Sequence, residues 1–135
     1  MNYKDLVEKA LKAKENAYAP YSKFKVGAAL LSNKEEVFTG CNVENASFGL
    51  TNCAERTAIF KAVSDGKKDF KAIALASDSD KIITPCGACR QVLLEFGPHI
   101  DVVMANNKGE YKVNKVMDLI PNGFDTEYLE EENKK

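Results

Sequence analysis

The sequence predicts a single α/β domain of three layers, in which a mixed sheet of about five strands lies between helices. Segments with apolar residues at helical spacing alternate with short apolar segments that are typical of buried strands. The 135-residue length is suited to one domain, and no repeat or linker interrupts it. At this length folding buries about two-thirds of the surface of the unfolded chain, so the core needs no disulfides.

The first predicted unit is a helix followed by a hairpin. Apolar residues recur at helical spacing across residues 3–18, and Pro20 ends this helix. Residues 24–31 and 37–43 are predicted as antiparallel strands, because a short polar connection at 32–35 separates two apolar segments.

Helices and strands then alternate up to residue 105, and a second strand and a helical turn follow. The later elements are predicted as helix 52–64, strand 70–76, helix 86–96, strand 100–105, strand 111–113 and a helical turn at 116–119. Asp65-Gly66 ends the first of these helices, since glycine adopts the left-handed cap conformation. Residues 1–135 form one predicted domain, in which the mostly charged residues 127–135 are a solvated tail or frayed helix end.

Charge and apolar patterning exclude two classes of partner. Nineteen basic and twenty acidic side chains give a net charge of −1, which removes the electrostatic basis for nucleic-acid binding. The longest apolar stretch, residues 26–31, is too short to span a membrane, and the first residues lack the apolar core of a signal peptide. We therefore expect a cytoplasmic protein with a small-molecule substrate and no membrane partner. Reduced thiols there favour metal binding or catalysis over disulfides.

Three of the four cysteines lie at two predicted helix starts. Cys53 opens one helix, and Cys86 and Cys89 form a Cys-x-x-Cys pair in the first turn of the other. Two sulfurs at this spacing converge on one ion at Zn–S distances of about 2.3 Å, and helix N-termini stabilise thiolates. Three protein ligands leave one position of a tetrahedral zinc open, which is typical of a catalytic site.

Charged residues beside these cysteines complete the predicted site. Glu55 lies two residues after Cys53, so its carboxylate is expected near the metal-bound water without being a ligand. Three thiolates make the zinc complex anionic and weaken its effect on water. Arg56 and Arg90 are the candidate donors to the sulfurs that offset this charge, together with the helix dipoles.

Four blocks carry a resemblance to a known family. They are YSKFKVGAA at 21–29, CNVENAS at 41–47, CAER at 53–56 and PCGACRQ at 85–91. In this order they closely resemble motifs of the small homotetrameric cytidine deaminases, and the resemblance covers residues 3–128. It implies that family's fold and the zinc-dependent hydrolysis of cytidine and deoxycytidine to the uridine nucleosides, with release of ammonia.

The resemblance also implies a role for each matched residue. Cys53, Cys86 and Cys89 would bind one Zn²⁺ per subunit, and Glu55 would move protons between water and the base. The implied substrate contacts are Asn42 and Glu44 on the ribose, Phe24 beside the pyrimidine, the Ala54 N–H on the base carbonyl and a backbone carbonyl near Thr84 on the amino group. Phe124 would reach into a neighbouring subunit's site, so a homotetramer would complete the active sites.

Other interpretations stay open at this stage. Cys41 could be a fourth zinc ligand in a closed structural site, which would make the chain an interaction module, although a lone strand cysteine is more typically a buried small side chain. His99 lies outside the matched motifs and is expected in a loop or on the surface. Without the motifs, Phe24 would be core, Asn42 and Glu44 turn residues, and Arg56 half of a solvated ion pair.

Related substrates are also possible within the enzyme class. These are a nucleotide, a tRNA adenosine or a nucleoside antibiotic. Glu44 argues against a nucleotide, because a carboxylate repels a nearby 5′-phosphate and no basic cluster offsets it.

Overall fold

The computed structural model describes residues 1–125, which form five strands, four α-helices and two 3₁₀ helices. In chain order the elements are α1 (Tyr3–Ala13), η1 (Lys14–Asn16), β1 (Val26–Ser32), β2 (Val37–Cys41), η2 (Phe48–Leu50), α2 (Ala54–Ser64), β3 (Phe70–Ser77), α3 (Gly87–Phe96), β4 (Asp101–Ala105), β5 (Tyr111–Lys115) and α4 (Val116–Leu119). The predicted tail at 127–135 lies outside the described residues. None of the helices within residues 1–125 has the length and apolar character needed to cross a membrane.

The five strands form one mixed sheet in the order β2-β1-β3-β4-β5. β3 and β4 are parallel, and the other three neighbouring pairs are antiparallel. The parallel pair requires a crossover, which α3 provides between β3 and β4. This arrangement confirms the predicted mixed sheet of about five strands.

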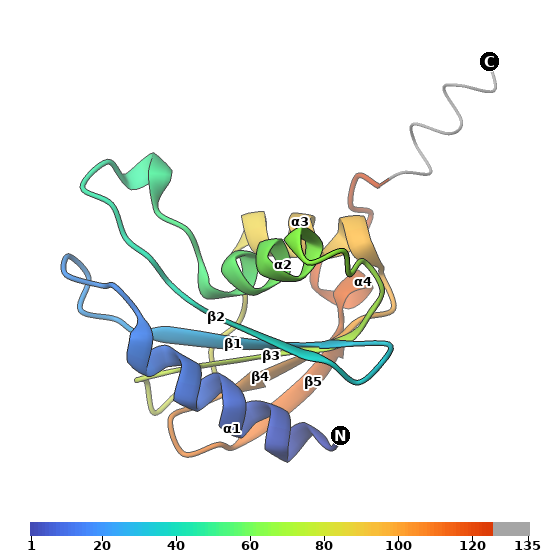
Figure 1. Cartoon of the computed structure of the whole chain (residues 1–135), viewed down its shortest axis with the longest axis horizontal. Coiled ribbons are helices and arrows are strands. Elements are labelled where there is room, and N and C mark those ends of the chain that lie inside the picture. The colour runs from blue at the N-terminus through green and yellow to red at the C-terminus, as the bar shows by residue number, and fades with distance from the viewer. Residues whose placement is uncertain (126–135) are drawn as a thin grey trace.

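The helices cover both faces of the sheet, with α1 on one face and α2, α3 and α4 on the other (Figure 1). Side chains of the strands alternate between these faces. In β1, for example, Ala28 and Leu30 join the core cluster with α2 and α3, whereas Ala29 and Leu31 join the cluster with α1. The three predicted layers are therefore confirmed, and each face of the sheet has its own core.

The first helix is shorter than predicted. We expected it to continue to residue 18, but α1 ends at Ala13 and a 3₁₀ turn follows. The Tyr18 N–H donates to the Asn42 carbonyl at 2.9 Å, and the Tyr18 carbonyl accepts from the Glu44 N–H at 2.8 Å. This pairing takes the backbone out of the helix although helical periodicity continues. The same segment thereby brings residues 18–25 beside the end of β2.

Several other boundaries move by one to three residues. β1 begins at Val26 rather than at residue 24, and β2 ends at Cys41 rather than at residue 43. The two cysteine-bearing helices begin at Ala54 and Gly87, so Cys53 and Cys86 are their N-caps. These shifts place the motif residues in loops and helix starts at one end of the sheet.

Gly27 allows α1 to lie directly against β1. A Cβ at this position would come within 2.0 Å of the Ala10 carbonyl oxygen and 2.5 Å of the Lys14 backbone nitrogen. Both are backbone atoms, so no side-chain rotation can relieve the overlap. The end of α1 is thus fixed against the start of β1.

We predict that Gly27→Ala lowers the free energy of unfolding by about 1–3 kcal/mol, because it forces α1 away from the sheet. Gly49→Ala is the matched control, since a Cβ there has no atom within 4 Å. It should change stability by no more than about 0.5 kcal/mol. Denaturant unfolding of both variants measures this, and equal midpoints would refute the packing argument.

Candidate metal centre and active-site cavity

The three predicted metal ligands come from two helix starts on the same face of the sheet. Cys53 is the N-cap of α2 and Cys86 is the N-cap of α3, and neither side chain caps its own helix. Cys89 lies in the first turn of α3 and is fully buried. Because the first backbone N–H groups of each helix lack intrahelical partners, both helix ends present partial positive charge to the sulfurs.

The sulfur positions fit one tetrahedral zinc ion. The Sγ atoms of Cys53 and Cys86 are 3.7 Å apart, and all three sulfurs lie within 4.8 Å of one another. Zn–S bonds of about 2.3 Å in a tetrahedron place two sulfurs about 3.8 Å apart. Among residues 1–125 this is the one cluster of three potential ligands, and it includes neither Cys41 nor His99. The closed four-cysteine site is therefore not formed.

Arg56 provides the positive charge next to the sulfurs. Its Nη2 donates to Cys53 Sγ at 3.1 Å. The hydrogen bond from Cys89 and the contact with Arg56 lower the pKa of Cys53, whereas donating that bond and burial raise the pKa of Cys89. Zn²⁺ binds cysteine as the thiolate, and the Arg56 guanidinium favours this charged form at Cys53.

Arg90, the other candidate donor to sulfur, has different partners. Its Nε donates to the Pro85 carbonyl and its Nη1 to the Leu119 carbonyl, both at 2.8 Å. Arg90 therefore holds the segment before Cys86 against α4. Of the two arginines, Arg56 is the one that the structure places in contact with a ligand sulfur.

Glu55 is a buried carboxyl group in the first turn of α2. Glu55 is only 4% exposed, and it lines the same cavity as Cys53 and Cys86. Burial raises the pKa of Glu55 to about 7, and the negative charge of Cys53 adds to the effect. A carboxyl group with this pKa can both accept and donate a proton near neutral pH.

The cavity beside these residues has a volume of about 510 Å³, within the usual range of ligand pockets. One part of its lining is apolar and consists of Phe24, Val26, Leu75, Ile82 and Ile83. The rest of the lining includes the two predicted ribose contacts, Asn42 and Glu44. Thr84 and the buried Ala54, whose backbone groups are predicted to bind the base, also line the cavity. No lysine, arginine or histidine is among its lining residues within the described chain.

Asn42 links two segments of this lining. Its Oδ1 accepts from the Val26 N–H, and its Nδ2 donates to the Phe24 carbonyl, each at 2.8 Å. Asn42 therefore fixes the backbone on both sides of Lys25. The Phe24 side chain is 39% exposed and lines the cavity, so the alternative that it belongs to the core is wrong.

Glu44 organises the neighbouring loop. Its Oε1 accepts from the backbone N–H groups of Tyr21 and Ser22 at 3.0 and 3.1 Å, and the Ser22 hydroxyl donates to Oε2. These hydrogen bonds, chiefly those from Ser22, lower the pKa of Glu44. The cavity wall therefore carries an ionised carboxylate.

Phe124 does not line the cavity of its own chain. The residue is 59% exposed, and its carbonyl accepts from Gln91 Nε2 at 2.7 Å. The prediction that Phe124 reaches into the active site of a neighbouring subunit is taken up below as a proposal.

Some cavity residues were missed by the sequence analysis. Ile82 and Ile83 lie between Lys81 and Thr84, outside any strand or helix, and an apolar pair in a polar loop was the available signal. Thr57 was also missed. Its hydroxyl accepts from Asn52 Nδ2 and donates to the Cys53 carbonyl, both at 3.1 Å, and so it supports the start of α2.

Comparisons with known proteins agree with this geometry. The family model for the cytidine and deoxycytidylate deaminase zinc-binding region matches residues 1–106. The cytidine deaminase of Sporosarcina psychrophila is 48% identical over 130 residues, 96% of each chain. That of Halalkalibacterium halodurans is 48% identical over 128 residues, covering 94% of this chain and 97% of the relative.

Solved structures show the same relationship. The crystal structure of cytidine deaminase from Burkholderia pseudomallei is 53% identical, with a TM-score of 0.89, and covers 92% of this chain and 100% of its own. The enzyme from Mycobacterium tuberculosis is 38% identical with a TM-score of 0.81 and covers 92% and 98%. The chain therefore belongs to the zinc-binding cytidine and deoxycytidylate deaminase family.

Proposed function

We propose that this protein is a zinc-dependent cytidine deaminase, which hydrolyses cytidine and deoxycytidine to uridine and deoxyuridine and releases ammonia, a reaction of pyrimidine salvage. The observation that carries the proposal is that the buried Glu55 lines the same cavity as Cys53 and Cys86. Relatives that are 48% identical over almost the whole chain are cytidine deaminases, which supports the reaction. We place the enzyme in the cytoplasm, because metal binding by cysteines requires reduced thiols.

Cys53, Cys86 and Cys89 would hold one Zn²⁺ per subunit. A zinc ion with an open position acts as a Lewis acid and makes water a nucleophile near neutral pH. Arg56 lies against the Cys53 sulfur and reduces the net negative charge of the three thiolates. This compensation matters because an anionic ligand set weakens the acidity of the metal.

Glu55 would move the protons of the reaction. Its carboxylate accepts a proton from the water whose oxygen bonds to C4 of the pyrimidine, and it passes that proton to N3. It then transfers the second proton of the water to the amino group, so that the C4–N4 bond breaks and ammonia leaves. The pKa of about 7 suits a group that must be deprotonated and reprotonated in each cycle.

Backbone groups and Phe24 would orient the base. The Ala54 N–H at the first position of α2 has no intrahelical acceptor, and we propose that it binds the base carbonyl. The backbone carbonyl near Thr84, which lines the cavity, would accept from the amino group. Phe24 would pack beside the pyrimidine ring at the apolar side of the cavity.

Asn42 and Glu44 retain hydrogen-bonding capacity for the ribose hydroxyls. Asn42 uses one lone pair and one N–H for the backbone of Val26 and Phe24, which leaves one acceptor and one donor site. The Glu44 carboxylate accepts three hydrogen bonds from Tyr21 and Ser22, and about one of its four acceptor sites remains. Both residues can therefore hold their loops and bind substrate.

We further propose a homotetramer in which Phe124 of one subunit completes a neighbour's site. Phe48, Leu50 and Phe124 are 81%, 69% and 59% exposed, which is unusual for large apolar side chains unless they form an interface. A second, mostly apolar hollow of about 330 Å³ shares Ser22, Glu44 and Thr51 with the main cavity. A partner's aromatic ring would fill this hollow next to the ribose site.

Glu55→Gln should lower kcat for cytidine by about 10²–10⁴-fold, because the amide cannot carry the proton. The zinc content should stay at one per chain, since the three sulfurs are unchanged. The change in ultraviolet absorbance as cytidine is converted to uridine gives kcat, and metal analysis of the same preparation gives the zinc content.

Cys41→Ser is the control for that experiment. Cys41 is outside the three-sulfur cluster, so this variant should keep both zinc and activity. Near wild-type turnover by Glu55→Gln would show that the enzymatic assignment is wrong, and loss of zinc from Cys41→Ser would restore the four-cysteine interpretation.

The cavity charge predicts a preference for nucleosides. Glu44 is ionised and no basic residue is among the described lining residues, so a 5′-phosphate meets repulsion without compensation. We expect kcat/KM for cytidine and deoxycytidine to exceed that for their monophosphates by at least ~100-fold. Adenosine should not react. A preference for either monophosphate in a parallel assay would contradict this charge argument.

Completion of the site by a neighbour predicts complementation between two inactive variants. Glu55→Gln supplies Phe124, and Phe124→Ala supplies Glu55. Subunits mixed under exchange conditions should therefore regain activity, whereas each variant alone should have little. If Phe124 acts within its own subunit or has no role, mixing would give only the sum of the separate activities. Light scattering gives the mass of the assembly in the same samples.

A further inference from the structure

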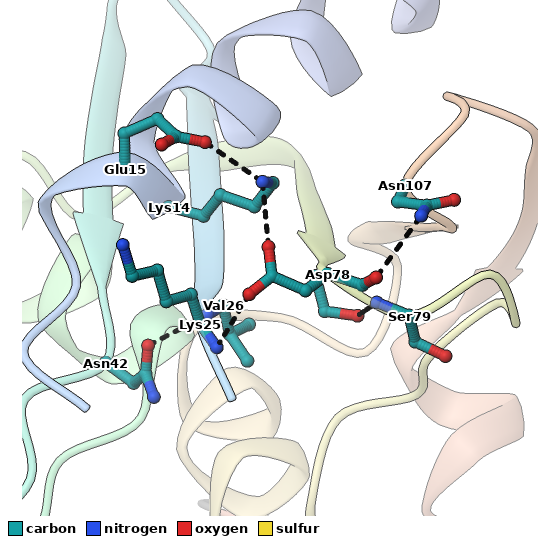
Figure 2. A network of polar contacts seen from close by, with 9 residues as sticks. Lys14, Glu15, Lys25, Val26, Asn42, Asp78, Ser79 and Asn107 are labelled. Carbon is teal, nitrogen blue, oxygen red and sulfur yellow. Dashed lines mark hydrogen bonds and ion pairs between the residues drawn. The ribbon is translucent and has the colours of Figure 1, made fainter. Parts of the chain in front are cut away.

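Asp78 connects two segments of the cavity wall without lining the cavity itself. It follows β3 and begins the loop that leads to Ile82, Ile83 and Thr84. Its Oδ1 contacts Lys14 Nζ at 2.9 Å, and its Oδ2 accepts from the Lys25 N–H at 3.4 Å. Figure 2 shows Asp78 between these two groups.

Lys14 holds Asp78 from a rigid part of the fold. It lies at the end of α1, where the close contact with Gly27 fixes the helix against β1. Its side chain is only 14% exposed, and Nζ also contacts Glu15 Oε1 at 3.0 Å. The ion pair raises the pKa of Lys14 and lowers that of Asp78, so both groups are charged at neutral pH.

The loop after Asp78 has a second attachment on the other side. The Asp78 carbonyl accepts from Asn107 Nδ2 at 3.2 Å (Figure 2). The Ser79 carbonyl accepts from the Asn107 N–H at 2.8 Å. Asn107 belongs to the turn between β4 and β5. The first residues of the loop are thus held between α1 and this turn.

Lys25 carries the effect of Asp78 to the proposed nucleoside contacts. It lies between Phe24 and Val26. The Val26 N–H donates to Asn42 Oδ1 (Figure 2), and the Phe24 carbonyl accepts from Asn42 Nδ2. A shift of the Lys25 backbone must therefore move Phe24 or strain both hydrogen bonds of Asn42. Neither Lys14 nor Asp78 is among the residues that line the cavity with Cys53, Cys86 and Glu55.

We propose that Lys14 and Asp78 are positioning residues that set the distance between the Phe24–Asn42 side of the cavity and the loop 78–84. The pair acts on nucleoside binding through Phe24 and Asn42, and its hydrogen bonds and ion pairs include neither the three cysteines nor Glu55. The proposal rests on the proposed function, because it assigns the pair to the affinity for cytidine.

Lys14→Met and Asp78→Asn test the pair. Methionine keeps the apolar stem of the lysine, and asparagine keeps an acceptor for the Lys25 N–H. Each variant should raise KM for cytidine by about 3–10-fold while kcat changes by less than about 2-fold, as expected for an ion pair that acts on binding. The double variant should be no worse than the single ones, since the same interaction is lost.

Lys115→Met is the matched control. Lys115 forms a partly exposed ion pair with Asp101 at 2.7 Å, at the end of β4 that pairs with Ala72 rather than at the cavity. It should leave KM and zinc content unchanged. An unchanged KM in both Lys14→Met and Asp78→Asn, additive effects in the double variant, or an equal rise in Lys115→Met would overturn the proposal.

Amide hydrogen exchange separates this proposal from the proposed function. If the wild-type protein fails to convert cytidine, the enzymatic assignment fails, but the positioning of the two segments can still be measured. Amides of residues 24–26 and 79–83 should exchange faster in Lys14→Met and Asp78→Asn than in wild type or Lys115→Met. Equal exchange in all four proteins would overturn the positioning role.

Discussion

The convergence of two helix N-termini on three sulfurs is the constraint on which the rest of the site depends. α2 can approach the sheet closely because Gly40 has no side chain: a Cβ there would be 2.5 Å from the Ala58 nitrogen. α3 follows the central strand β3 and returns to its parallel neighbour β4. The sheet thus sets where both helices begin. The N-termini of the two helices, together with Arg56, stabilise the anionic cluster.

The nucleoside side of the cavity is built differently, from loops that polar side chains hold in place. Asn42 and Glu44 each bind backbone groups of residues 21–26. The same two side chains are the proposed ribose contacts. Removing either one therefore changes the shape of the site as well as its hydrogen bonds, and a loss of activity in such variants combines both effects.

The sequence allowed the metal ligands and the layers to be predicted. Cysteines at helix starts and alternating apolar segments are local patterns. The convergence of Cys53 with a cysteine 33 residues away is a distant contact, and the family resemblance supplied the support for it. The end of α1 was mispredicted, since the pairing of Tyr18 with Asn42 and Glu44 is a tertiary contact that helical periodicity does not show. Lys14 and Asp78, 64 residues apart, likewise carry no local signal of their contact.

The placement of positive charge also explains why a neutral substrate suits this cavity. Arg56, the arginine in the first turn of α2, directs its guanidinium to the Cys53 sulfur. Arg90 binds two backbone carbonyls, and Lys14 binds Asp78 and Glu15. These three cations are therefore already bound to protein groups, while Glu44 and Glu55 line the cavity. A phosphate would find no cationic partner among the described lining residues, whereas ribose hydroxyls and a neutral base find several polar ones.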